Sequence, residues 1–98
     1  MEFVDKDVIL EYLRDQKDVL LDKFGVTKIA LFGSYARDEQ HRDSDIDLLI
    51  ETDRKDYKNR FFLKEYLEKE FNRKVDVNYF DSVRLFIRHH IEKDLIYV

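Results

Sequence analysis

The sequence has 98 residues, a formal net charge of −4 and a pI near 5.3, and it contains no cysteine. This length suits one domain over residues 1–98, the acidic balance argues against a general nucleic-acid binder, and the lack of thiols excludes disulfides and thiolate metal sites. Because the N-terminus lacks a secretory pattern and no apolar run approaches the length of a membrane span, we expect a cytoplasmic protein without a membrane partner.

The first predicted elements are a helix and a strand. Apolar residues recur near helical spacing from about Asp5 to Phe24, and Gly25 follows as a C-terminal stop. The apolar run Lys28–Phe32 is typical of a short buried strand, and it ends abruptly at Gly33. The helix should therefore cover one face of a sheet that contains this strand.

The turn after this strand has the features of a phosphate site. Gly33 lacks a Cβ atom, which lets main-chain amides approach an anion. Ser34 is a candidate helix N-cap, with Tyr35–Arg37 following it. Free N–H groups, a hydroxyl and the positive end of a helix dipole would then converge on one anion.

Two alternating aspartates begin the next predicted strand. Asp45 and Asp47 lie two residues apart in the segment Ser44–Ile50, so their side chains should share one face of the strand. Two carboxylates about 4 Å apart repel by roughly 4 kcal/mol at an effective dielectric constant near 20. A Mg²⁺ ion relieves this repulsion, and it prefers one or two carboxylates together with substrate phosphates.

A third acid follows a second helix. Periodic apolar residues predict a helix over Lys55–Phe71, in which Phe61 and Phe62 widen the apolar arc enough to suggest a partner surface. The segment Lys74–Phe80 then reads as a strand with Asp76 on the polar face. Asp76 would complete a triad that binds two metal ions, and it could also accept a proton.

The remaining residues predict a closing helix from about Ser82 to Glu92 and a short edge strand over Leu95–Val98. Helices and strands thus alternate in the order αβαβαβα. We predict an α+β fold with a mixed three- to four-stranded sheet flanked by helices.

These motifs match a known family signature. Gly-Ser, ten residues and Asp-x-Asp occur without a gap in GSYARDEQHRDSDID. In this respect the chain resembles the minimal nucleotidyltransferases of the DNA polymerase β-like superfamily, and the resemblance covers nearly the whole chain. Asp38 stands where family members commonly have glycine after Ala-Arg, which is the one departure within the turn.

The resemblance implies a function narrower than polymerisation. Small stand-alone members resemble the antitoxins of toxin–antitoxin pairs, which transfer AMP from ATP to a tyrosine of an all-helical HEPN toxin. By this similarity Gly33, Ser34 and Arg37 would bind the triphosphate. The three acids, Asp45, Asp47 and Asp76, would serve catalysis and hold two Mg²⁺ ions. A hetero-oligomer with the toxin is then expected.

Two alternatives stay open at this point. The chain could be a binding-only antitoxin that neutralises its partner by occlusion, with the arc around Phe61 and Phe62 as its docking surface. It could also adenylylate a small molecule, although such enzymes usually carry an additional helical domain for the acceptor.

Overall fold

The computed structural model describes residues 3–54, 56–82, 89 and 91–98. The helices are α1 (Lys6–Asp15), α2 (Lys17–Phe24) and α3 (Tyr57–Phe71), and the strands are β1 (Val26–Phe32), β2 (Ile46–Thr52), β3 (Val75–Tyr79) and β4 (Ile96–Tyr97). Two short 3-10 helices, η1 (Phe80–Ser82) and η2 (Glu92–Asp94), precede and follow the undescribed segment near the C-terminus.

The four strands form one mixed sheet in the order β3-β2-β1-β4. β1 pairs antiparallel with both β2 and β4, whereas β2 and β3 run parallel. The parallel pair is possible because α3 provides the crossover between its two strands. The predicted α+β class, the mixed sheet and the edge strand near the C-terminus are therefore confirmed.

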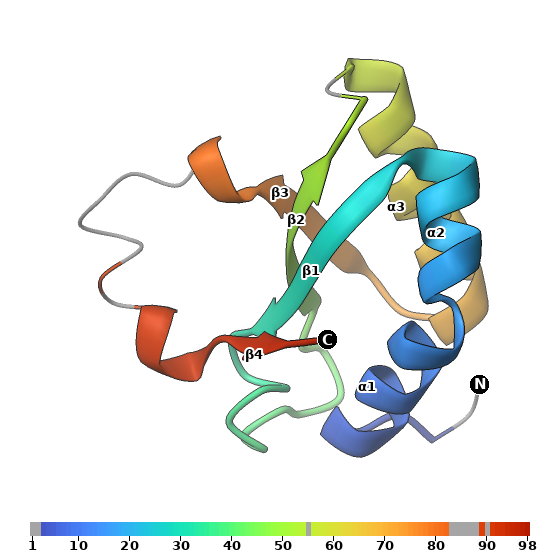
Figure 1. The fold of residues 1–98 in the computed structure, drawn as a ribbon. Helices are drawn as coiled ribbons and strands as arrows, with labels where there is room; N and C mark the ends of the chain where they lie inside the picture. The colour runs from blue at the N-terminus through green and yellow to red at the C-terminus, as the bar shows by residue number, and fades with distance from the viewer. Residues whose placement is uncertain (1–2, 55, 83–88, 90) are drawn as a thin grey trace.

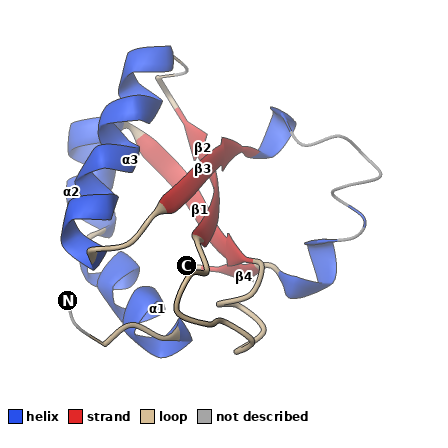
Figure 2. Ribbon diagram, turned by 180° about the vertical axis from the view of Figure 1, so that it is seen from behind, coloured by secondary structure: helices blue, strands red, loops and turns tan. Residues whose placement is uncertain are grey.

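Side chains alternate between two unequal faces of the sheet. The helices α1, α2 and α3 all lie on one side (Figures 1 and 2), and they bury the larger apolar cluster. The buried strand residues of this cluster are Val26, Ile29, Leu31, Ile46, Leu48, Ile50, Val75 and Val77. Among the described residues, the opposite face carries a smaller buried cluster of Ala30, Leu49 and Phe80. Since neighbours in a strand point to opposite faces, Asp47 and Asp76 lie on this second face.

The element order differs from the prediction at the N-terminus. The expected single helix from Asp5 to Phe24 is two helices, because the backbone leaves helical geometry at Gln16, with φ −98° and ψ 6°. Asp5 caps α1 by accepting a hydrogen bond from the Val8 amide at 2.9 Å. The polar residues around the break contribute nothing to the core, so no packing holds a continuous helix there, and α2 turns to lie alongside β1 (Figure 1).

The later boundaries follow local signals. β1 begins two residues before the predicted Lys28, and α3 begins at Tyr57 because Asp56 caps it through the Asn59 amide at 2.7 Å. The predicted closing helix from Ser82 to Glu92 lies mostly outside the described residues. In the part of the chain that the structure describes, no helix combines the length and apolar character needed to cross a membrane.

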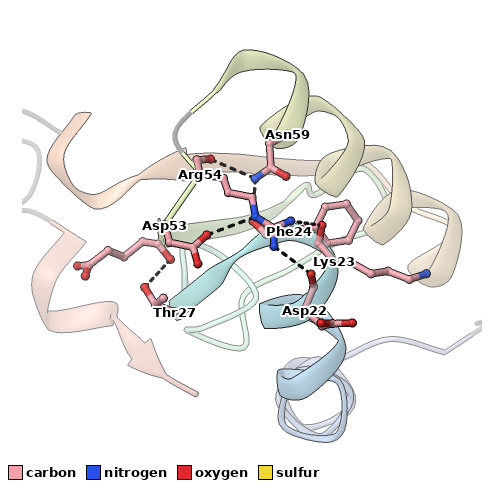
Figure 3. Close-up of polar contacts among 8 residues, drawn as sticks. Asp22, Lys23, Phe24, Thr27, Asp53, Arg54 and Asn59 are labelled. Carbon is pink, nitrogen blue, oxygen red and sulfur yellow. Dashed lines mark hydrogen bonds and ion pairs between the residues drawn. The ribbon is translucent and has the colours of Figure 1, made fainter.

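A polar network joins the C-terminal end of α2 to the segment between β2 and α3 (Figure 3). Arg54 donates to the carbonyls of Lys23 at 2.9 Å and Asp22 at 3.2 Å. The Asn59 amide nitrogen donates to the carbonyls of Phe24 at 2.8 Å and Arg54 at 3.2 Å. The carbonyls that a helix leaves unpaired at its C-terminus are satisfied in this way.

We predict that Asn59→Asp lowers the free energy of unfolding by about 1–3 kcal/mol, because the new carboxylate has no donor for the two carbonyls that the amide now contacts. Urea denaturation monitored by circular dichroism measures this loss. Lys58→Gln is the matched control, since it makes the same change in charge at an exposed neighbouring position. Equal stability of the two variants would contradict the assigned role.

Candidate functional site

The loop after β1 forms a single helical turn that closes at once. Glu39 N–H donates to the Ser34 carbonyl at 2.9 Å and Asp38 N–H donates to the Tyr35 carbonyl at 3.3 Å. Asp38 itself is left-handed, with φ 57°. This is the Schellman arrangement that ends helices. The predicted helix starting at Ser34 is therefore wrong, because this turn does not continue into a helix before β2.

The same geometry explains why Asp38 can stand where the family pattern commonly has glycine. A left-handed residue in this position favours glycine, and aspartate is one of the few other residues that tolerate it. Lys6 of α1 forms an ion pair with Asp38 at 3.0 Å. Tyr35, which the sequence analysis did not single out as a core residue, is only 2% exposed and anchors the turn in the core.

Gly33 lies directly against one of the acids. Its φ is +79°, and a Cβ atom added there would collide with the Asp47 Oδ2 atom. The strand register accounts for this, because Phe32, the residue before Gly33, pairs with Asp47. Only glycine leaves the turn close to the carboxylate without displacing it.

The structure places two of the predicted acids side by side, and the third is near enough for its charge to act on one of them. Asp47 of β2 and Asp76 of β3 are paired positions in the parallel register. Asp45 lies two residues before Asp47 and is exposed. Burial first, and then the charges of Asp76 and Asp45, raise the pKa of Asp47 to about 6, although the charge of Arg37 acts in the opposite direction. The Asn78 amide donates to the Asp76 Oδ2 atom at 3.3 Å.

This donor set fits Mg²⁺. Among the described residues, no group of three or more His, Cys, Asp or Glu side chains is placed to hold a metal ion. However, Mg²⁺ usually takes one or two carboxylates and completes its shell with water and substrate phosphates. Burial is the main cause of the raised pKa of Asp47, and the repulsion from Asp76 and Asp45 that adds to it is what a bound divalent cation would relieve.

Arg37 belongs to the turn that begins at Gly33, whose carbonyl accepts a hydrogen bond from the Arg37 backbone N–H at 3.2 Å. Its guanidinium donates to Glu39 at 3.0 Å and to Asp94 at 3.0 Å, and these bonds raise its pKa. Arg37 was predicted from the sequence as a site residue, whereas Asp94 was not. No local pattern could have found Asp94, because it is 57 residues away along the chain.

Comparisons with known proteins agree with this geometry. Residues 13–98 match the model of the nucleotidyltransferase domain. The chain is 47% identical over 94 residues to "Putative protein adenylyltransferase MJ1379" of Methanocaldococcus jannaschii, covering 92% of this chain and 94% of that protein. It is 32% identical over 99 residues to "Protein adenylyltransferase MntA" of Thermococcus cleftensis, with 100% of both covered.

Solved structures are similar as well. A protein described as a "putative minimal nucleotidyltransferase" superposes with a TM-score of 0.78 at 26% identity, covering 98% of both chains. A chain from the "toxin-antitoxin with AMP-PNP" superposes with a TM-score of 0.59 at 29% identity. That match covers 83% of this chain and 61% of the other.

The raised pKa of Asp47 predicts how stability depends on pH in the metal-free protein. Since the folded pKa of about 6 lies above the value of about 4 for an unfolded aspartate, ionisation of Asp47 destabilises the fold. This cost is absent below about pH 4, grows as the pH rises and is complete above about pH 6. Asp47→Asn should therefore be more stable than wild type at pH 7.5 and equally stable at pH 4.

Urea denaturation in EDTA at the two pH values measures this difference. Asp43→Asn provides the control, because it removes one carboxylate from the exposed loop outside the paired strands. A stability gain for Asp47→Asn that is larger at pH 4 than at pH 7.5 would refute the assignment.

Proposed function

The chain belongs to the nucleotidyltransferase family, as a minimal member, and from this premise we propose that it transfers AMP from ATP to a hydroxyl group of a partner protein. The acceptor is a tyrosine of a helical HEPN toxin, which makes the chain the antitoxin of the pair. The observation that carries the proposal is the pairing of Asp47 and Asp76 beside the Gly33 turn. The relative MntA, named a protein adenylyltransferase, supports a protein acceptor over a small molecule.

The residues assigned to the triphosphate and to the acceptor hydroxyl lie on opposite sides of β2. The Gly33 turn follows β1, whereas Asp76 belongs to β3, and β2 with Asp47 lies between those strands. An in-line displacement needs its leaving and attacking oxygens on opposite sides of the phosphorus. We therefore assign the β- and γ-phosphates to Gly33, Ser34 and Arg37, and the acceptor hydroxyl to the Asp76 side.

The acids position and neutralise the reacting groups. Asp45, Asp47 and Asp76 would hold two Mg²⁺ ions. When bound, these supply charge neutralisation and lower the pKa of the attacking hydroxyl. The acceptor oxygen bonds to the α-phosphorus while the bond from that phosphorus to the bridging oxygen of the β-phosphate breaks, and pyrophosphate leaves. Asp76 takes the hydroxyl proton, so that AMP becomes esterified to the acceptor.

We expect Asp47→Asn and Asp45→Asn to abolish adenylyl transfer. Each change removes a carboxylate charge that would hold the metal ions, and the triphosphate would bind through those ions. The chain is incubated with ATP labelled at the α-phosphate, Mg²⁺ and the helical protein encoded beside it, and label on that protein is counted. Asp43→Asn keeps full activity as the control in the same loop. Equal labelling by all four proteins would rule the mechanism out.

Neutralisation by occlusion is a second candidate, and the exposed aromatic pair on α3 favours it. Phe61 is 46% exposed and Phe62 is 58% exposed, and their rings pack edge to face at 5.8 Å. Apolar rings exposed together are typical of a surface that binds a partner. Such a surface would serve either candidate, because a protein acceptor must also dock.

Cells that express the toxin separate the two candidates. If transfer neutralises the toxin, Asp47→Asn should lose protection although its aromatic pair is intact. If occlusion is sufficient, Asp47→Asn should still protect, and replacing Phe61 and Phe62 by serine should abolish protection. Growth on induction, with expression levels checked by immunoblot, is the measurement.

A further inference from the structure

Arg37 is the cation of the phosphate turn, and its position is defined by two carboxylates. The Nε atom lies 3.0 Å from the Glu39 Oε2 atom, and the Nη1 atom lies 3.0 Å from the Asp94 Oδ2 atom. The Nη2 group takes part in neither bond. It can therefore still donate to an anion while the other two nitrogens hold the guanidinium plane.

The two carboxylates are not equivalent. The Glu39 side chain is 65% exposed and is only two residues from Arg37, so it moves with the same turn. The Asp94 side chain is 15% exposed and belongs to η2, a separate element. An enclosed carboxylate on another element can fix Arg37 in space, whereas an exposed neighbour on the same turn contributes little.

The sheet holds Asp94 in register with the phosphate turn. η2 leads directly into β4, and β4 pairs with Ala30 and Leu31 of β1. β1 in turn ends at Phe32, just before Gly33. The loop between β1 and β2 lies between β4 and α1 (Figure 1), so the Arg37–Asp94 pair ties it to one side and the Lys6–Asp38 pair to the other.

We propose that Asp94 is a positioning residue for nucleotide binding. It holds the Arg37 guanidinium so that the remaining N–H donors contact the triphosphate. Arg37 belongs to the turn beside Asp47, because its backbone N–H donates to the Gly33 carbonyl at 3.2 Å and Gly33 lies directly against the Asp47 carboxylate. A cation held in place before the ligand arrives binds more tightly, since less side-chain freedom is lost on binding. The inference rests on the proposed function, which makes ATP the substrate.

A competing role for Asp94 predicts the opposite change in nucleotide affinity. If Asp94 merely competed with phosphate for Arg37, removing its carboxylate would free the guanidinium and tighten nucleotide binding. If Asp94 positions Arg37, removing it weakens binding, and the loss depends on the presence of Arg37.

Isothermal titration calorimetry of the full chain with AMP-PNP and Mg²⁺ tests the proposal. We expect Asp94→Ala to weaken binding by roughly tenfold and Arg37→Ala by at least as much. Combining the two changes should cost no more than Arg37→Ala alone, because Asp94 acts through Arg37. Asp94→Asn, which preserves shape, should weaken binding by less, and thermal melting checks that each variant folds.

Lys6→Gln is the matched control, because it breaks the other ion pair of the same turn and leaves Arg37 intact. If Lys6→Gln weakens binding as much as Asp94→Ala, the effect is general ordering of the turn and the proposal is overturned. Unchanged or tighter binding by Asp94→Ala, or additive losses in the double variant, also overturn it. Failure of the wild type to bind AMP-PNP would instead refute the proposed function.

Discussion

The parallel pairing of β2 with β3 is the constraint on which this site depends. It places Asp47 beside Asp76 on the face opposite α1, α2 and α3, and half-burial together with the charges of the neighbouring acids raises the pKa of Asp47 to about 6. Like charges held together in this way cost folding free energy in the metal-free protein. The apolar face on the other side of the same strands offsets this cost, because Leu48 and Val77 alternate with the two acids and are fully enclosed.

The turn between β1 and β2, which we propose binds phosphate, shows how a short chain can hold such a loop without a long helix directly after it. Tyr35 buries its ring in the core, and the Schellman geometry at Asp38 ends the segment after a single helical turn. Lys6 from the first helix and Asp94 near the C-terminus then form ion pairs with residues of this turn. Elements from both ends of the chain thus converge on the loop that follows Gly33.

Much of the fold and most of the candidate site could be predicted because their signals are local. Alternation in the segments around Asp47 and Asp76 assigned both acids to polar strand faces, and the abrupt end of β1 located Gly33. The helix expected at Ser34 was wrong because Asp38 takes a left-handed conformation and closes the turn. The break at Gln16 was missed because apolar spacing continues through it, while the backbone is free to bend where nothing packs.

The sequence by itself determined which residue types alternate within each element, and therefore which acids could share a face. Only the tertiary structure decided that β3 lies parallel to β2 with Asp47 opposite Asp76, and that Asp94 meets Arg37. The physical reason is the distance along the chain over which each kind of contact acts. Periodicity records the contacts of a residue with its own strand or helix, whereas strand order and side-chain ion pairs across 57 residues arise from the packing of the whole chain.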